Sequence, residues 1–364
     1  MRKITSALMI ILFLILPFSG CQKAPKNEYT KYTNSFFDTF DTLTTVVAYT
    51  RSEEEFNSYM EKIHARFQEL HKLYDIYNDY EGVNNVKTIN DNAGVKPVKV
   101  HKDIIDLIVF AKDWYNRTGG RTNIAMGSVL SIWHDYREEG RDTPENAKLP
   151  PIEDLKEALK YTDINKVIVD IENSTVFLSD KRMTLDIGAV AKGFATEIVA
   201  KEIMAAGLTS GIISSGGNVR ALGKPLDGVR ERWGVGIQNP DRSIVSEEEK
   251  NLETIFLNNA SVVSSGDYQR YYIVENKIIH HLIDPKTLMP GEYYRAVTVV
   301  TEDSGVADFL STTVYLMPYK ESRALVESVE GVEALWVMHD GKIEATEGMK
   351  KIMKSQGASG GKEK

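Results

Sequence analysis

The feature that most constrains this chain is the segment Asp186–Ala195, in which an extended run turns into a helix. Residues 183–186 have the pattern of an extended run, a turn is expected at Gly188, and Lys192 falls in the first turn of the helix that follows. Small residues let a ligand approach the backbone, and the free N–H groups and dipole of a helix start favour phosphate oxygens. The segment therefore indicates a phosphate site, although a structural turn with a solvated lysine has the same pattern.

The N-terminus has the pattern of an export signal. Two basic residues precede an apolar stretch at 7–18, which is too short for a convincing membrane span. Phe18-Ser19-Gly20-Cys21 follows and resembles a bacterial lipobox, with Phe18 in place of the usual Leu. Cys21 is the only cysteine, so we expect it to carry acyl chains such as palmitate after removal of a lipoprotein signal peptide, residues 1–20. An ordinary secretory signal with an incidental cysteine is the alternative.

Beyond the signal, residues 21–35 are expected to be a polar anchor spacer, and residues 36–350 the globular body. Residues 351–364 are small and polar, so we expect a disordered tail. The net charge is −8 and no long basic tract is present, which makes nucleic acid an improbable partner. We expect a lipid-anchored protein on the extracytoplasmic (periplasmic) face of a bacterial cell membrane.

Periodic patterns alternate between helix and strand along the body. The capping box of Ser52 and Glu55 predicts a helix that apolar residues at helical spacing carry to Tyr74. Further helices are expected at 103–115, from 188 to 207 and at 307–316, with polar loops at 75–92 and 138–151. Strands are expected at 40–49, 167–171, 175–178, 211–214, 234–238, 261–265, 269–274, 277–283, 295–301, 335–338 and 342–345. This order predicts a mixed α/β (α+β) fold of two lobes, with mixed sheets and flanking helices.

Three further segments carry residues suited to chemistry. Ser214–Asn218 and Ser264–Tyr268 each place glycine at the end of a short strand, where the backbone can bend around a ligand. In the strand expected at 277–283, His281 and Ile283 share one face, so His281 can enter a site as a general base while His280 is solvated. Each of these segments, taken alone, is also compatible with a purely structural role.

A fourth segment suggests a metal. Asp308, Ser311 and Thr312 fall at i, i+3 and i+4 near a helix start, so their oxygens line one helix face. Hard oxygen ligands of this kind suit Mg²⁺ rather than zinc. A helix cap with a buried threonine has the same spacing.

Together, these segments resemble the ApbE family of bacterial flavin transferases, over residues 37–337. Asp186–Ala195 looks like the family's D-x-G-x-x-A-K-G-Y-A run, Ser215–Asn218 like its G-G-N, and Trp233–Pro240 like its W-x-V-x-I-x-x-P. Ser265–Arg270 looks like its S-G-D-Y-x-R, His281–Pro285 like its H-I-I-D-P, and Asp308 with Thr312 like its A-D-x-x-x-T. Six matches in the family's order make the resemblance specific.

The resemblance implies Mg²⁺-dependent transfer of FMN from FAD to a threonine hydroxyl of a partner protein, with release of AMP. It implies targets among membrane respiratory subunits of the Rnf or sodium-pumping quinone reductase type. Metal ligands would be the Ala189 carbonyl with Asp308, Ser311 and Thr312, and His281 would take the proton. Contacts to FAD would come from Phe40, Tyr77, Thr122, Asn123, Asp186, Lys192 and Ile283.

Three positions depart from the family pattern. Asn123 stands where the family usually has Asp, Phe40-Asp41-Thr42 replaces Met-Gly-Thr, and Leu288 replaces a Gly. None removes an implied metal ligand, but each can change flavin affinity or the balance between transfer and hydrolysis.

Two other functions use the same residues. A Mg²⁺-dependent FAD pyrophosphatase would pass FMN to water, giving FMN and AMP. A lipoprotein that binds FAD without catalysis would have no need of the metal cluster. If His281 is not the base, Asp284 is the next candidate.

Cys21→Ala should block processing of the signal and retention of the mature form at the membrane, because Cys21 is the only thiol that can be acylated. Cell fractionation and the mass of the mature chain measure this. Equal processing of wild type and variant, with both in the soluble fraction, would contradict the lipoprotein interpretation.

Overall fold

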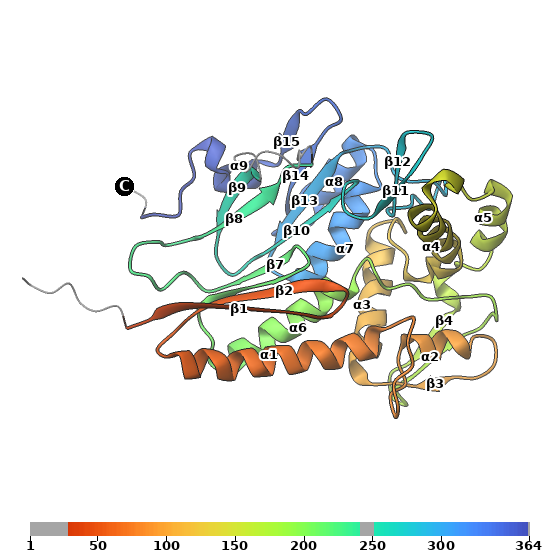
Figure 1. Cartoon of the computed structure of the whole chain (residues 1–364), viewed down its shortest axis with the longest axis horizontal. Coiled ribbons are helices and arrows are strands. Elements are labelled where there is room, and N and C mark those ends of the chain that lie inside the picture. Colours follow the sequence, from red (N-terminus) through yellow and green to blue (C-terminus); the bar gives the residue numbers. More distant parts are fainter. Residues whose placement is uncertain (1–27, 241–250, 363–364) are drawn as a thin grey trace, which may run out of the picture.

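A large antiparallel sheet organises the computed structural model, which describes residues 28–240 and 251–362 (Figure 1). The predicted signal peptide and Cys21 lie outside the described residues. The strand order in this sheet is β1-β2-β6-β7-β10-β13-β14-β15. Its strands are β1 (Thr30–Thr39), β2 (Thr42–Thr50), β6 (Gly211–Ser215), β7 (Asn218–Leu222), β10 (Ser261–Gly266), β13 (Ala296–Thr301), β14 (Glu333–Val337) and β15 (Ile343–Ala345).

Three smaller sheets complete the β structure: β3-β5-β4, β8-β9 and β11-β12. Their strands are β3 (Val98–Lys99), β4 (Val167–Asp170), β5 (Thr175–Leu178), β8 (Trp233–Gln238), β9 (Asn251–Leu257), β11 (Tyr271–Val274) and β12 (Lys277–His280). Every strand pair in the described residues is antiparallel, so the sheets themselves are not mixed as predicted. The predicted combination of helices and strands in one fold is confirmed.

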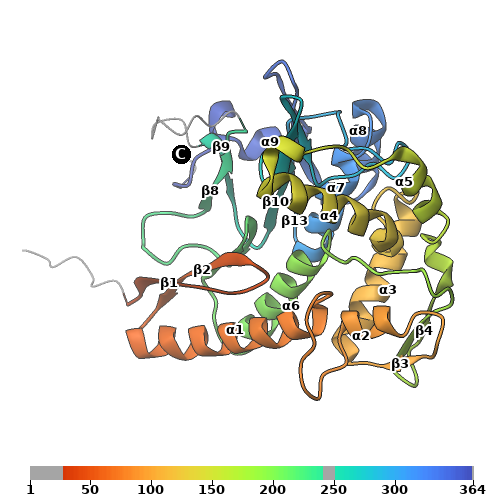
Figure 2. The same ribbon diagram turned by 45° about the vertical axis from the view of Figure 1, so that its right-hand side comes forward.

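The α-helices are α1 (Glu53–Tyr74), α2 (Val86–Asp91), α3 (Lys102–Arg117), α4 (Gly127–Asp142), α5 (Ile152–Leu159), α6 (Ala191–Ala205), α7 (Ser304–Tyr315), α8 (Tyr319–Ser328) and α9 (Glu347–Ile352). Short 3₁₀ turns lie at Ile124–Met126, Pro144–Asn146, Ile164–Lys166 and Lys354–Gln356. Figures 1 and 2 both place α1 and α6 on one side of the large sheet and β8 and β9 on the other.

The strands β13 and β14 of the large sheet are buried on both faces, and β14 shows why. Ala334 and Trp336 point into the core that the helices cover, whereas Leu335 and Val337 point into a second core shared with β8, β9 and α9. Alternate residues of a strand face opposite sides, so a strand between two layers is apolar on both. The sheet is therefore a shared wall between the two cores.

Helices α1, α6 and α7 form according to the expected signals. The Ser52 side chain accepts a hydrogen bond from the Glu55 N–H, and the apolar stripe of α1 from Phe56 to Tyr74 is buried. Helix α6 begins at Ala191, which puts Lys192 in its first turn as predicted. Helix α7 starts earlier than expected, because Asp303 caps it by accepting hydrogen bonds from the N–H groups of Gly305 and Val306.

The predicted ends of the globular body are wrong. Residues 30–35, expected in the spacer, belong to β1, and Thr30 pairs with Thr50. This edge strand is mostly exposed and polar, so its sequence lacks the alternation of a core strand. The expected disordered tail is ordered through residue 362: Met353 is buried, and the Gly360 carbonyl accepts hydrogen bonds from the N–H groups of Glu231 and Arg232. Backbone hydrogen bonds hold the C-terminal segment in place, and amino-acid composition does not predict such bonds.

Two predicted loops contain helices, and two predicted strands have different bounds. Residues 86–91 form α2, which the Asn85 and Thr88 side chains cap. Helix α4 continues to Asp142, inside the predicted loop 138–151. Strand β2 starts only at Thr42, and β12 ends at His280, so strand alternation does not govern His281.

Within the described residues, no helix has the length and apolarity needed to cross a membrane.

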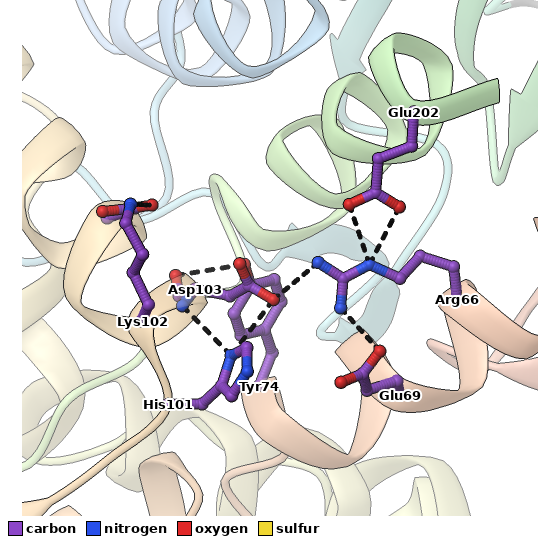
Figure 3. Close-up of polar contacts among 8 residues, drawn as sticks. Arg66, Glu69, Tyr74, His101, Lys102, Asp103 and Glu202 are labelled. Carbon is purple, nitrogen blue, oxygen red and sulfur yellow. Dashed lines mark hydrogen bonds and ion pairs between the residues drawn. The ribbon is translucent and has the colours of Figure 1, made fainter. Parts of the chain in front are cut away.

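The Arg66 guanidinium joins three helices, and Figure 3 shows it between three carboxylates. It donates hydrogen bonds to Glu69 of α1 at 2.6 Å, to Asp103 of α3 at 2.7 Å, and to both oxygens of Glu202 of α6 at 3.1 Å. The Arg66 side chain is only 18% exposed. A single fork-shaped cation therefore fixes α1 and α3 against α6, the helix that carries Lys192.

Arg66→Ala should lower the free energy of unfolding by about 1–3 kcal/mol, because it leaves three carboxylates close together without their common cation. Arg66→Lys should lose less, since it keeps the charge but not the fork. The matched control is Lys102→Ala, which removes an ion pair between Asp106 and a lysine that is 75% exposed, and should cost less than about 0.5 kcal/mol. Urea unfolding measures all three, and equal losses at Arg66 and Lys102 would contradict the role of the three-helix contact.

Candidate functional site

A cavity of about 980 Å³ lies where β2, α4, α6, α7 and the segment after β12 meet. This volume is at the upper end of the ~300–1,000 Å³ typical of small-molecule sites. Of the predicted site residues in the described part of the chain, all but Ser311 line it: Phe40, Tyr77, Thr122, Asn123, Asp186, Ala189, Lys192, His281, Ile283, Asp308 and Thr312. The structure thus brings together residues that lie up to 272 positions apart, from Phe40 to Thr312.

Close packing of α6 on α7 sets the floor of the cavity. A Cβ atom at Gly193 would lie 2.3 Å from the Asp308 Cβ and 2.4 Å from the Ser304 carbonyl oxygen, so only glycine fits. The Gly193 N–H donates a 2.7 Å hydrogen bond to Oδ2 of Asp308. Burial raises the pKa of Asp308, and the Lys192 charge, the Gly193 N–H and the Asn218 amide partly offset it.

The start of α6 is less open to an anion than the sequence predicts. The Ala191 N–H donates to the Ile187 carbonyl at 2.9 Å, and the Phe194 N–H donates to the Val190 carbonyl at 3.0 Å. The Gly193 N–H donates to the Asp308 carboxylate. The Lys192 ammonium, in contrast, has no ion-pair partner among the described residues. The side chain of Lys192, more than the helix start, is therefore the group available to a phosphate.

The predicted metal ligands are only partly brought together. Asp308, Thr312 and Ala189 line the cavity, and they would offer a carboxylate, a hydroxyl and a carbonyl oxygen. Ser311 does not line the cavity: its hydroxyl donates to the Asp308 carbonyl at 2.9 Å and lies 2.9 Å from the Ser265 hydroxyl. No cluster of three or more His, Cys, Asp or Glu side chains that could hold a metal is present in residues 28–240 and 251–362.

His281 is oriented by the backbone of Arg270. Its Nδ1 lies 3.2 Å from the Arg270 carbonyl oxygen, which can only accept, so Nδ1 carries the proton and Nε2 keeps its lone pair. The His281 backbone N–H donates to the same oxygen at 3.1 Å. This tautomer leaves Nε2 as a proton acceptor at the cavity.

Desolvation in the cavity, followed by the positive charges of Arg270, Arg137 and Lys192, lowers the pKa of His281 to about 3. The imidazole is therefore neutral at physiological pH. An anion bound among these cations would raise this pKa again and strengthen the base.

The two other candidates for the general base, His280 and Asp284, are both hydrogen-bonded to the protein itself. His280 was expected to be solvated, but it is buried: its Nδ1 accepts from the Leu282 N–H at 3.2 Å and its Nε2 donates to the Gly291 carbonyl at 2.9 Å. Asp284 is also buried and accepts from the Lys286 N–H and the Tyr293 hydroxyl, with Arg121 3.5 Å away. Neither residue is free to move a proton in the cavity.

Aromatic rings form two walls. The Phe40 ring packs 5.6 Å from His71 and 6.3 Å from Phe67, and the Tyr77 ring lies 5.5 Å from His134, tilted by 32°. Burial, and then the negative charges of Asp186 and Asp41, raise the pKa of Tyr77, while Arg137 and Arg270 act in the opposite direction. Charges of both signs therefore act on Tyr77.

Three other residues that were predicted to contact FAD make hydrogen bonds within the protein. The Thr122 hydroxyl lies 2.8 Å from the Thr313 hydroxyl. The Asn123 amide donates to the Thr162 carbonyl and its oxygen accepts from the Ala125 N–H, both at 2.8 Å. An aspartate could not make the first of these bonds, which accounts for Asn at this position. Oδ1 of Asp186 accepts from the Gly188 N–H at 2.9 Å and shapes the turn into α6.

Several cavity residues were missed from the sequence. His134 and Arg137 lie on α4, where Arg137 donates to Nδ1 of His134 at 2.6 Å, and α4 itself was not predicted. Arg270 stands inside the S-G-D-Y-x-R match, so its motif position was a usable signal. Asp41 was noted only as a departure from the family pattern.

Comparisons with known proteins identify relatives of this chain. A model described as the ApbE family matches residues 40–336. The "FAD:protein FMN transferase" of Treponema pallidum (strain Nichols) is 30% identical over 304 residues, covering 79% of this chain and 81% of that protein. The protein of the same name from Klebsiella pneumoniae (strain 342) is 28% identical over 272 residues, covering 74% and 80%.

Solved structures have the same fold. The crystal structure of the ApbE protein from Thermotoga maritima superposes with a TM-score of 0.77 at 27% identity, over 89% of this chain and 99% of that one. The flavin transferase ApbE from Vibrio cholerae gives a TM-score of 0.72 at 20% identity, over 89% and 99%.

His281 should stay neutral in the ligand-free protein down to about pH 4, because its pKa is lowered to about 3 from an ordinary value of 6.5. Between these values the unfolded chain binds a proton that the folded chain does not, so stability falls as the pH falls through this range. NMR titration of the imidazole, assigned by its loss in His281→Gln, measures the first effect. A midpoint near 6.5 would contradict the orientation and the desolvation described here.

Proposed function

The chain belongs to the ApbE family, and from that premise we propose that it transfers FMN from FAD to a threonine hydroxyl of a partner protein and releases AMP. The observation that carries the proposal is one cavity that is lined by His281, with Nε2 unprotonated, by cationic side chains and by the buried Asp308. This arrangement suits cleavage of a diphosphate by a hydroxyl nucleophile.

The charges in the cavity support FAD as the substrate. Lys192, Arg137 and Arg270 surround His281 and would bind the negative diphosphate. The Phe40 and Tyr77 rings would stack on a flavin or adenine ring, which is flat and largely apolar. The cavity thus offers both kinds of surface that FAD needs, cationic side chains and aromatic rings.

A magnesium ion fits part of the predicted ligand set. Asp308, Thr312 and the Ala189 carbonyl would hold it through hard oxygen atoms, and the ion would offset the burial that raises the pKa of Asp308. When bound, Mg²⁺ would neutralise diphosphate oxygens and polarise the attacked phosphorus.

His281 would act on the incoming hydroxyl. Its Nε2 takes the threonine proton as the hydroxyl oxygen attacks the phosphorus of the FMN half and the bond to the AMP half breaks. The Arg270 carbonyl keeps the imidazole in the required tautomer by accepting from Nδ1. Negative charge on the bound diphosphate would raise the His281 pKa toward neutrality, where a general base works best.

We further propose that the enzyme is lipid-anchored through Cys21 on the extracytoplasmic face of the cell membrane. Acceptors would then be membrane respiratory subunits of the Rnf or sodium-pumping quinone reductase type. The lipobox-like sequence and the family resemblance support this placement.

The direct test is to incubate the protein with FAD, Mg²⁺ and a candidate acceptor, with the acceptor's threonine replaced by alanine as the control. In-gel flavin fluorescence reports transfer, and chromatography reports AMP. FMN and AMP without labelled acceptor would favour the pyrophosphatase, and bound but intact FAD would favour a non-catalytic binder. FAD that neither binds nor reacts would contradict the proposal.

Two variants should separate the roles in this reaction. His281→Ala should slow turnover by about 10²–10⁴-fold while FAD still binds, because a general base acts on rate. Asp308→Ala should reduce turnover in a way that raised Mg²⁺ partly restores, and Ser311→Ala on the same helix should leave the Mg²⁺ dependence unchanged. Loss of FAD binding in His281→Ala would make His281 a ligand contact instead.

A further inference from the structure

The turn between β1 and β2 holds two residues in a conformation that side chains rarely adopt. Phe40 has φ 54° and Asp41 has φ 48°, and Thr39 pairs with Thr42 across the turn. Left-handed backbone favours glycine, and a bulky residue such as Phe there is a true outlier. Aspartate is among the residues that tolerate the left-handed region, so Asp41 adds a carboxylate to the turn without disrupting its backbone.

The surroundings hold this turn in place. The Phe40 N–H donates to Nδ1 of His71 at 3.3 Å, and the Phe40 ring packs against Phe67, His71 and Tyr74. Gly216 packs closely against Thr42, since a Cβ atom built on Gly216 would be 2.3 Å from the Thr42 hydroxyl. A two-residue hairpin turn requires positive φ at both of its residues, so the turn fixes the backbone at Asp41 and leaves the side chain free to serve the cavity.

Asp41 lines the cavity, it is exposed, and no ion pair of it is found among the described residues. Its negative charge acts to raise the pKa of Tyr77, whereas the charges of Arg137 and Arg270 act to lower it. A carboxylate there would repel the diphosphate if the two were adjacent, so its partner must be a different part of the nucleotide. The neutral groups of FAD that can donate to a carboxylate are the ring N–H groups and the sugar or ribityl hydroxyls.

We propose that Asp41 is a specificity-determining contact of this chain, which accepts a hydrogen bond from a neutral N–H or O–H donor of the bound nucleotide. The inference rests on FAD being the substrate. It assigns a hydrogen-bond partner to a carboxylate that lines the cavity.

The test compares Asp41→Gly, Asp41→Ala and Asp41→Asn in thermal unfolding and in calorimetric binding of FAD, FMN and AMP. Asp41→Gly should raise Tm by about 1–3 °C, because glycine relieves the strain, and Asp41→Ala should lower it. Both should weaken FAD binding by about tenfold or more, because both lack the acceptor. Asp41→Asn keeps an acceptor oxygen and tolerates the left-handed region, so it should retain most of the affinity.

The matched control is Asn276→Gly in the two-residue turn between β11 and β12, where Glu275 and Asn276 also have positive φ. It does not line the cavity and should leave FAD affinity unchanged. Weaker FMN binding in the Asp41 variants would place the donor on the flavin half, and weaker AMP binding would place it on the adenosine half.

If Asp41→Ala loses both stability and FAD affinity while Asp41→Gly keeps both, Asp41 only shapes the turn. That result would overturn the inference. Unchanged affinity in every variant would do the same while leaving the proposed function intact. Failure of the wild-type protein to bind FAD would instead contradict both.

Discussion

The contact between Gly193 and Asp308 is the constraint on which the rest of the site depends. It allows two helix backbones to approach until an N–H of α6 bonds a carboxylate of α7. That single approach buries Asp308, sets Lys192 at the cavity and brings Thr312 to the same wall. Any larger side chain at 193 would separate the two helices and, with them, the cationic and anionic halves of the site.

The parts of the fold that could be predicted are those governed by local physics. The Ser52 cap and the amphipathic stripe of α1 form within one helix, and the turn at Gly188 into α6 depends on neighbouring residues. Asp186, Lys192, His281 and Asp308 were expected from short segments that join a turn or a helix start to a residue suited to chemistry, and all four line the cavity. The other lining residues that were expected, such as Phe40 and Tyr77, came only from the family resemblance. The parts of the fold that were not predicted depend on residues far away in the sequence. Edge strand β1 gains its order from β2, and the C-terminal segment from Glu231 and Arg232, which no local pattern reports.

His281 illustrates the limit within the site. Strand alternation predicted that His281 enters the site and that His280 is solvated, but His280 is buried, β12 ends at His280, and the Arg270 carbonyl orients the His281 imidazole. Two departures from the family pattern have a common physical meaning that only the structure reveals. Asp41 and Leu288 both have positive φ, so each stands where glycine would be least strained. Leu288 is buried, and its carbonyl accepts from the Trp133 indole N–H, so its side chain adds packing as well as strain.

The order of strands in the large sheet also sets when the site can exist during synthesis. Thr44 of β2 bonds Ser215 of β6, 171 residues further along the chain, and β13 and β14 join still later. Contacts between such distant segments form slowly and only after the whole chain is available. At ~5–20 residues per second, the first strands wait roughly 15–60 s for the last. The flavin cavity, whose walls come from both ends of the sequence, is therefore a late product of folding, and the nascent chain has to stay soluble without it.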